Sequence, residues 1–386
     1  MQLTMQLIGV LAFIVALLLS VMVHEFGHFI TARKFGMKVS EFFLGFGTRI
    51  WSTKRGETEF GIKAIPAGGY CRIEGMDPDE VMETGQEHRS FYKASSGRKL
   101  IVLGAGSFNH FVLGFLLLFT LLAGIGVNTL TSTVETVAPN SAAQKAGFKS
   151  GDVVLSIEGK EVTDWMKDAA AIRESNGNEV SFTVDRSGEE ISLVATPVLT
   201  KISDTESRYL VGIINKVGTK RVNPVTSFTS AGSLTWEMTK SSAKALVALP
   251  SKLPALWDQT FGGQERDVNG LVGVVGVARV SGETVASGDL TWTQRIGTFI
   301  LIVASLNIFV GLFNLLPLLP LDGGHMAIAI ADEVRAFIAR LRGRPRPAGI
   351  DVKVLTPITM VVFVLLAAMT VLLLIADIFN PVSLNL

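Results

Sequence analysis

The chain has 386 residues, of which 48% are hydrophobic and only 18% are charged, whereas a globular domain carries about 25% charged residues. Its mean hydropathy of +0.43 excludes a disordered or collagen-like chain. With 35 basic and 34 acidic residues the net charge is +1, so no overall field recruits nucleic acid. The single cysteine, Cys71, permits no internal disulfide and cannot by itself make a thiolate metal cluster.

Four stretches contain no Asp, Glu, Lys or Arg, and each is long enough to cross a bilayer, which takes about 20 helical residues. They are residues 1–23, 101–134, 296–321 and 354–376. The first lacks the basic start and the small-residue cleavage site of a secretion signal, so we expect it to remain as an anchor. The predicted fold class is a polytopic α-helical membrane protein with four transmembrane helices.

The distribution of positive charge indicates which loops face the cytoplasm. Residues 33–99 hold 12 Lys and Arg, and residues 322–353 hold six against four acids. Residues 135–295 are nearly balanced, with 17 basic and 19 acidic side chains. We therefore expect the two basic loops to be cytoplasmic, and both termini and the long segment to be extracytoplasmic.

The long outer segment opens with a small α+β pattern. Residues 132–137 and 153–157 alternate like strands, with a short helix and a glycine turn between them. Residues 180–184 and 191–195 are predicted to form a hairpin. The pattern resembles a bacterial PDZ domain over about residues 131–216, and the alternative is a spacer with no ligand. Beyond it lie two helix-like stretches and a glycine-rich run, 268–278, which is too short to span and fits an interfacial or re-entrant piece.

The first apolar stretch continues into His24-Glu25-Phe-Gly-His28, an HExxH motif. On a helix, His24 and His28 share a face, so both can bind one metal ion, and Glu25 lies at the edge of that face, where it can take a proton from water. Counted back from Arg33 at 1.5 Å per residue, His24 lies about 14 Å along the helix. Ionisable groups at bilayer depth are costly and are functional by default.

A catalytic zinc site normally has three protein ligands, and two acids directly border the later spans at their downstream ends. Asp322 follows the third span on the same side of the membrane as the histidine pair, whereas Asp377 follows the fourth span on the opposite side. Asp322 is therefore the predicted third ligand. Pro317 and Pro320 interrupt the helix before it, and broken backbone at membrane depth is tolerated where it lines a cavity. His325 is expected to play an outer or structural role.

These motifs together resemble the site-2 protease family of intramembrane zinc metalloproteases, in particular the bacterial type similar to the regulator of sigma-E protease. The resemblance covers nearly the whole chain and includes the HEFGH sequence, the PDZ-like segment and the run from Asn314 to Gly324. It implies Zn²⁺ as the cofactor, His24, His28 and Asp322 as its ligands, and Glu25 as the general base.

The resemblance also implies a substrate-binding surface. Residues 59–73 alternate and then turn at Gly68-Gly69, similar to the family's membrane-associated β-hairpin, whose edge can hold an unwound substrate as a strand. The predicted substrate-binding residues are Asn314, Pro317, Gly68 and Gly69. Residues 104–109 look like the family's Gly-Pro-x-x-Asn element, although Ser107 stands where that element has proline. Only one PDZ-like segment is present instead of two.

The function implied is hydrolysis of peptide bonds within or near the transmembrane segment of single-pass membrane proteins, such as anti-sigma factors, that an upstream site-1 protease has already trimmed. The implied location is the bacterial inner membrane, with the lipid bilayer as a partner and no nucleic acid. One alternative is a non-enzymatic PDZ scaffold or chaperone with a degenerate metal site. Another is a metal transporter, which predicts inverted repeats that the sequence does not contain.

The predicted domain organisation follows the spans and loops in chain order. It comprises the first transmembrane helix with HExxH (1–33), a cytoplasmic loop with the β-hairpin (34–99), the second helix (100–130), the PDZ domain (131–216), extracytoplasmic interfacial helices with the glycine-rich segment (217–295), the third helix with the Asp-Gly motif (296–325), a basic cytoplasmic loop (326–353), and the fourth helix with a C-terminal tail (354–386).

Overall fold

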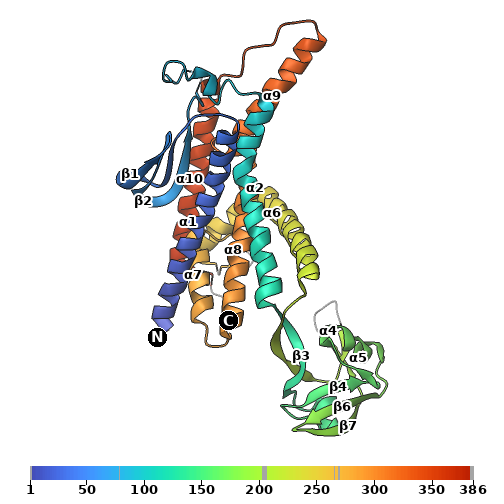
Figure 1. Ribbon diagram of the computed structural model, residues 1–386. Coiled ribbons are helices and arrows are strands. Elements are labelled where there is room, and N and C mark those ends of the chain that lie inside the picture. Colours follow the sequence, from blue (N-terminus) through green and yellow to red (C-terminus); the bar gives the residue numbers. More distant parts are fainter. Residues whose placement is uncertain (1, 78, 202–206, 265, 268–269, 383–386) are drawn as a thin grey trace. The chain divides into compact units, whose positions relative to one another are not determined.

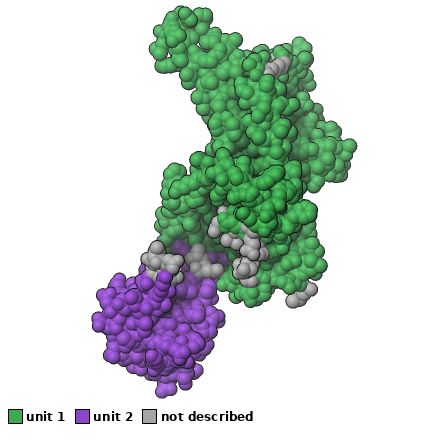
Figure 2. Space-filling model, turned by 180° about the vertical axis from the view of Figure 1, so that it is seen from behind, with its two compact units in different colours: residues 1–124, 223–386 green, residues 125–222 purple. Residues whose placement is uncertain are grey.

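A computed structural model describes residues 2–77, 79–201, 207–264, 266–267 and 270–382 (Figure 1). The chain divides into two compact units, which Figure 2 colours separately. Unit 1 comprises Met1–Gly124 and Asn223–Leu386, and unit 2 comprises Ile125–Val222.

Four described helices of unit 1 are long and apolar enough to cross a membrane, as predicted. They are α1 (Gln2–Lys34), α2 (Ser96–Thr120, extended by a π-helical turn, Leu121–Ile125), α8 (Trp292–Asn314) and α10 (Thr356–Phe379). The predicted end of the third span at residue 325 is wrong, because α8 ends at Asn314 and residues 315–321 are not helical. The sequence stays apolar past the end of α8. Pro317 and Pro320, however, have no backbone N–H to donate the hydrogen bonds that would continue the helix.

The segment between α1 and α2 forms a strongly bent sheet from two long strands, β1 (Val39–Arg55) and β2 (Thr58–Ile73). A tight turn at residues 56–57 joins the two strands. Residues 59–62 run parallel to residues 41–44 of β1 and residues 69–72 run antiparallel to them, so the chain also reverses direction between Ile62 and Gly69, close to the turn predicted at Gly68-Gly69. Both glycines lie within β2. Residues 41–44 of β1 pair with residues 59–62 on one side and with residues 69–72 on the other. The second half of β2 is therefore paired through β1 on one side only.

Among its described residues, unit 1 also contains the helices α6 (Pro224–Phe261), α7 (Val274–Ala286) and α9 (Asp322–Leu341), together with short 3₁₀ turns at Glu87–Arg89 and Val352–Leu355. The glycine-rich run, predicted as an interfacial or re-entrant piece, becomes helical at Val274, and its residues 268 and 269 lie outside the described residues. Helix α7 packs along α1. A Cβ on Gly9 of α1 would lie 2.8 Å from the Cα of Gly282, so only glycine permits this approach.

Asp377, near the end of α10, belongs to a buried polar junction and not to the histidine pair. Its carboxylate lies 3.2 Å from the guanidinium of Arg266, and the two side chains are 1% and 2% exposed. It also accepts hydrogen bonds from the backbone N–H groups of Gly273 and Gly276 in the first turn of α7. Asn380 donates to carbonyl oxygens at the end of α6 and just beyond it. The junction joins α10 to α7 and to the α6–α7 connection.

Unit 2 is an α+β domain built on an antiparallel sheet. The sheet order is β10-β3-β4-β6-β7, β5 pairs with β4, and β8 and β9 form a separate hairpin. The strands are β3 (Val127–Val137), β4 (Val153–Ile157), β5 (Lys160–Glu161), β6 (Val180–Arg186), β7 (Glu189–Ala195), β8 (Val198–Lys201), β9 (Ser207–Leu210) and β10 (Ile213–Lys220). The helices are α3 (Ala142–Ala146), α4 (Trp165–Asp168) and α5 (Ala170–Glu174).

The predicted strands and hairpin of unit 2 are confirmed by β3, β4, β6 and β7. Ser141 begins α3 by accepting a hydrogen bond from the N–H of Gln144, which satisfies one of the unpaired donors of the first turn. The β6–β7 turn places Ser187 and Gly188 at positive φ, as expected for a tight two-residue hairpin. The sheet and helices enclose a core that includes Phe148, Phe182 and Val184.

A buried carboxylate ties the β4 end of this sheet to β6. Asp152, which is 1% exposed, accepts hydrogen bonds from the Arg186 guanidinium at 2.7 and 2.8 Å and from the Lys149 N–H at 2.8 Å. Burial opposes ionisation of Asp152, but the hydrogen bonds from Arg186 and Lys149 outweigh it and hold its pKa below the ordinary value. A carboxyl with a lowered folded-state pKa stabilises the fold at pH values above its unfolded pKa.

We expect Asp152→Asn to destabilise unit 2 by about 1.5–3 kcal/mol at pH 7, because a buried charged hydrogen-bond acceptor is lost. In hydrogen exchange of the full-length protein, amides of β4 and β6 should then exchange roughly tenfold to a hundredfold faster. The extra stability of the wild type should decrease as the pH falls below about 3.9, the pKa of Asp in the unfolded chain. It should be lost once the pH has also fallen through the lower pKa of Asp152 in the folded protein. Glu190→Gln, at an exposed position of β7, is the control, and equal exchange in both variants would contradict the assignment.

Candidate active site

The HExxH motif lies on α1 with both histidines directed to one point. His24 and His28 are 7% and 8% exposed, and their Nε2 atoms are 3.1 Å apart. This follows from helix geometry, because residues four apart lie one turn above each other on the same face. The predicted pairing of the two imidazoles is therefore present in the structure.

Asp322 is the first residue of α9, and its carboxylate contacts both histidines of α1. Its Oδ2 atom lies 3.2 Å from Nε2 of His24 and 3.3 Å from Nε2 of His28. The non-helical residues 315–321 fold back onto the first turn of α9. A Cβ on Gly323 would lie 2.2 Å from the Leu316 carbonyl oxygen, so glycine after Asp322 is what allows the turn to close.

The three converging atoms suit a metal ion. The Nδ1 atom of His28 is 2.8 Å from the carbonyl oxygen of Val102, and since a carbonyl only accepts, Nδ1 carries the hydrogen and Nε2 of the neutral ring is a lone pair. Two imidazole nitrogens and a carboxylate oxygen lie within 3.1–3.3 Å of each other, so all three can coordinate one cation. Ligands at zinc distances of about 2.0–2.2 Å in a tetrahedron are roughly 3.4 Å apart. The donor set therefore fits zinc.

Beside these atoms is a cavity of about 230 Å³. Its lining comes from α1, α2, α8 and the turn before α9, and comprises Val21, His24, Glu25, His110, Val310, Asn314, Pro320, Leu321 and Asp322. The predicted residues Glu25 and Asn314 thus line the same cavity as His24 and Asp322. Pro320 lines the cavity, whereas the predicted Pro317 is not among its lining residues.

The two predicted glycines of β2 differ in their surroundings. A Cβ on Gly69 would lie 2.8 Å from Sδ of Met22 and 3.7 Å from Cγ of Glu25, so β2 passes directly beside the glutamate. Gly68 has φ +127° and its nearest neighbour is the Phe46 ring, so it shapes the path of β2 and does not face the cavity.

Two close backbone contacts hold α2 against the histidine-bearing face of α1. A Cβ on Gly27 would lie 2.5 Å from the Ala105 carbonyl oxygen, and one on Gly106 would lie 2.5 Å from Cε1 of His24. Asn109 donates a 2.8 Å hydrogen bond to the Val23 carbonyl oxygen, just before the motif. In this structure Asn109 thus contacts the α1 backbone.

His110 and Asn307 are functional candidates that the sequence reasoning missed. The His110 ring lies 5.0 Å from the His24 ring, centroid to centroid, and its Nδ1 is 2.8 Å from Oδ1 of Asn307. The available signal was that His110 is an ionisable residue inside an apolar span, which indicates function by default. His325, by contrast, is not part of the group of described side chains whose ligand atoms converge.

A helical membrane unit that brings HExxH and a distant aspartate together around a polar cavity defines a membrane-embedded metallopeptidase. The chain belongs to peptidase family M50, the site-2 protease family, whose model matches residues 12–365. It is 35% identical to zinc metalloprotease Rip1 of Mycobacterium tuberculosis, over 97% of this chain and 98% of that protein. It is 28% identical to a putative zinc metalloprotease of Clostridium perfringens, over 94% and 96%.

Among solved structures, the chain matches the PDZ domain of an SdrC-like protein from Listeria monocytogenes. The match has 16% identity and a TM-score of 0.20, and it covers 23% of this chain and 90% of that one. A TM-score this low does not establish a common fold.

We expect Gly106→Ala to lower metal affinity at least about tenfold, because its Cβ would lie 2.5–2.7 Å from ring atoms of both histidines. Gly104→Ala, two residues earlier on α2, is the matched control, since a Cβ there would lie 3.7 Å from Cε of Met326, an ordinary van der Waals contact. The measurement is zinc per chain after dialysis against a graded chelator. Equal zinc retention by the two variants would show that the histidine pair tolerates a displaced α2.

Proposed function

We propose that the chain is an intramembrane zinc endopeptidase that cleaves single-pass membrane proteins within or near their membrane segment. The observation that carries the proposal is the convergence of the His24, His28 and Asp322 ligand atoms within 3.1–3.3 Å of each other, with Glu25 in the same cavity. Three protein ligands with room for water is the arrangement of catalytic zinc sites.

In this proposal His24, His28 and Asp322 hold the zinc ion. When bound, zinc lowers the pKa of a coordinated water to about 7 and polarises the substrate carbonyl. Glu25 accepts a proton from the attacking water while the water oxygen adds to the carbonyl carbon of the substrate. The same carboxyl then delivers that proton to the amide nitrogen, so the C–N bond breaks to give a carboxylate and an amine.

The substrate is proposed to lie as an extended strand along the second half of β2. The peptide bonds of a helix are shielded by its own hydrogen bonds, so a segment must unwind before it is cut. The second half of β2 pairs with β1 on one side only and passes beside Glu25 at Gly69, which supports strand addition at this edge. Asn314 lines the same cavity and is proposed to hold the substrate backbone. Pro317 is proposed to act indirectly, by shaping the turn that carries Asp322.

The proposed location is the bacterial inner membrane, with both termini and unit 2 extracytoplasmic and the catalytic centre towards the cytoplasm. The support is the positive charge at Arg33 and Lys34 in the last turn of α1 and in the arginine-rich segment after α9. Neither the scaffold nor the transporter alternative has a specific observation in its favour.

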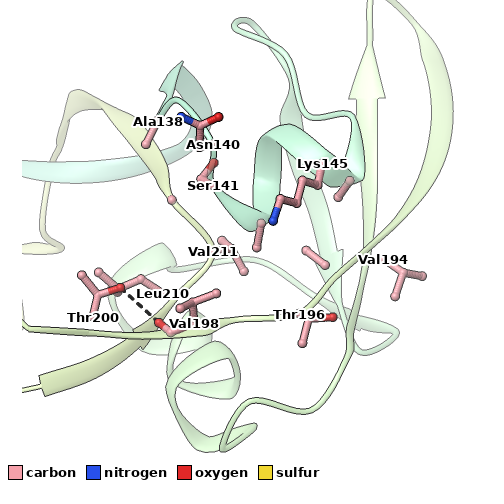
Figure 3. Close-up of a pocket in the computed structure, with 14 residues that line it drawn as sticks. Ala138, Asn140, Ser141, Lys145, Val194, Thr196, Val198, Thr200, Leu210 and Val211 are labelled. Carbon is pink, nitrogen blue, oxygen red and sulfur yellow. Dashed lines mark hydrogen bonds between the residues drawn. The ribbon is translucent and has the colours of Figure 1, made fainter.

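Unit 2 is proposed to be a PDZ domain that restricts cleavage to certain substrates. These substrates, such as anti-sigma factors, have already been trimmed outside the membrane by another protease. The antiparallel sheet of unit 2, flanked by short helices, supports this proposal. A cavity of about 710 Å³ lies between α3 and the β7–β8 connection (Figure 3). Its lining is mainly apolar, including Val194, Val198 and Leu210, with Lys145 as its cation. This chemistry suits an apolar peptide end that carries a carboxylate.

The central test uses purified protein in detergent and a pre-trimmed single-pass substrate. We expect Glu25→Gln to keep one zinc per chain but to lower cleavage about 100-fold to 10,000-fold, the usual contribution of a general base. Asp322→Ala is expected to lose zinc as well as cleavage. Retained cleavage by Glu25→Gln would refute its role, and an unchanged zinc content in Asp322→Ala would move the third ligand elsewhere.

The filter role of unit 2 predicts a gain of activity on deletion. Val127 pairs with Lys220 across β3 and β10, so the two ends of unit 2 are adjacent and residues 127–220 can be replaced by a short linker. We expect the deletion variant to cleave untrimmed substrate faster than the full chain, and to cleave trimmed substrate at the same rate. If untrimmed substrate remains uncut while trimmed substrate is cut normally, unit 2 is not the filter.

A further inference from the structure

The mechanism proposed above leaves one buried group of the cavity unused. His110 on α2 is 2% exposed, lines the cavity with Glu25 and Asp322, and is absent from the group whose ligand atoms converge. An imidazole inside an apolar span costs free energy that an aliphatic side chain would not. Its hydrogen bonds determine what it offers to the cavity.

A chain of hydrogen bonds through three helices fixes the tautomer of His110. Ser20 on α1 donates to the Ala16 carbonyl oxygen, so its oxygen is free to accept from Nδ2 of Asn307 at 3.0 Å. Nδ2 of Asn307 also donates to the Val303 carbonyl oxygen at 2.8 Å. Both amide hydrogens are thus used.

Asn307 Oδ1 is therefore an acceptor, and His110 Nδ1, which lies 2.8 Å from it, must carry a hydrogen. The neutral imidazole then has its lone pair on Nε2. Among the described residues, His110 makes its hydrogen bond through Nδ1 to Asn307, and none is seen at Nε2. His110 consequently offers the cavity a hydrogen-bond acceptor and no donor.

We propose that His110 is a further catalytic residue whose Nε2 atom accepts one hydrogen of the attacking water, while Glu25 accepts the other. A water molecule has two O–H groups, and orienting its lone pair towards a carbonyl carbon requires an acceptor for each. Glu25 and His110 Nε2 are acceptors, whereas the Asn314 amide both donates and accepts and so matches a peptide group. Asn307 is then a positioning residue that acts through His110.

This inference rests on the proposed peptidase function and adds no proton transfer to it. Only Glu25 takes and returns a proton, and His110 stays neutral throughout. The competing explanation is structural, since hydrogen bonds between His110, Asn307 and Ser20 also join α2, α8 and α1, as polar side chains do within membranes. The two explanations assign importance to different ring nitrogens, Nε2 in the first and Nδ1 in the second.

Two amide variants of similar size separate these explanations. His110→Gln places its amide near the former Nε2 position, facing the cavity, whereas His110→Asn places it near the former Nδ1 position, facing Asn307. We expect both to retain one zinc per chain. The Gln variant should retain most of the wild-type kcat on a pre-trimmed substrate, and the Asn variant should lose about 10- to 100-fold in kcat, as for other groups that support a metal site from outside its ligands, with KM unchanged. The reverse order of kcat would overturn the proposal.

A second measurement does not depend on cleavage and so separates this inference from the peptidase function. In zinc-free protein with ¹⁵N-labelled histidine, the chain's five histidines can be told apart by comparison with the His110→Gln spectrum. We expect His110 to show a protonated Nδ1 and an unprotonated Nε2, and Asn307→Leu to release that preference. A wild-type ring with hydrogen on Nε2 would overturn the proposal even if the protein cleaves substrate. If the wild type shows the expected tautomer but cuts no substrate, the peptidase function fails instead.

Discussion

The candidate metal centre depends on the close approach of the α1 and α2 backbones beside the histidine pair. Lipid supplies no hydrophobic force between helices, so membrane helices associate through small residues and hydrogen bonds. Gly27 and Gly106 provide the small residues, since a Cβ on either would lie 2.5 Å from an atom of the other helix. Asn109 adds a hydrogen bond to the Val23 carbonyl oxygen. The two imidazoles are therefore held between packed backbones and have little freedom to turn away.

A similar constraint acts where the chain returns to the site after α8. Helix α8 packs on α2 at Gly114 and Gly311, where added Cβ atoms would lie 2.8 Å from Ile308 and 2.9 Å from His110 respectively. The chain then leaves the helix, folds over the glycines after Asp322 and starts α9 with the carboxylate facing the histidines. The helix contacts near the site thus combine small residues, which let the backbones approach, with the hydrogen bonds of Asn109 and Asn307.

Local sequence patterns predicted the parts of this site that depend on local geometry. The pairing of His24 with His28 follows from helical periodicity, and the choice of Asp322 over Asp377 follows from counting membrane crossings. A reversal of β2 near Gly68-Gly69 was predicted from the glycines, but the pairing of residues 41–44 of β1 on both sides was not, because no local alternation reveals it. The role of His110 depends on Asn307, which is 197 positions away in the sequence. Four spans were predictable from composition. Pro317 and Pro320 indicated that the third helix is interrupted, but the apolar residues before them did not show that α8 already ends at Asn314.

Helix α10 is anchored very unevenly along its length. In its most apolar 18-residue window none of the residues is buried within the protein, whereas its last turn carries the Asp377 carboxylate that pairs with Arg266. Removing one partner of a buried pair of this kind costs about 3–5 kcal/mol, because the other charge is left uncompensated, whereas contacts with lipid are exchanged at little cost. We therefore expect α10 to stay fixed at its Asp377 end, because sliding along its axis would break this pair, while the rest of the helix is free to tilt within the bilayer.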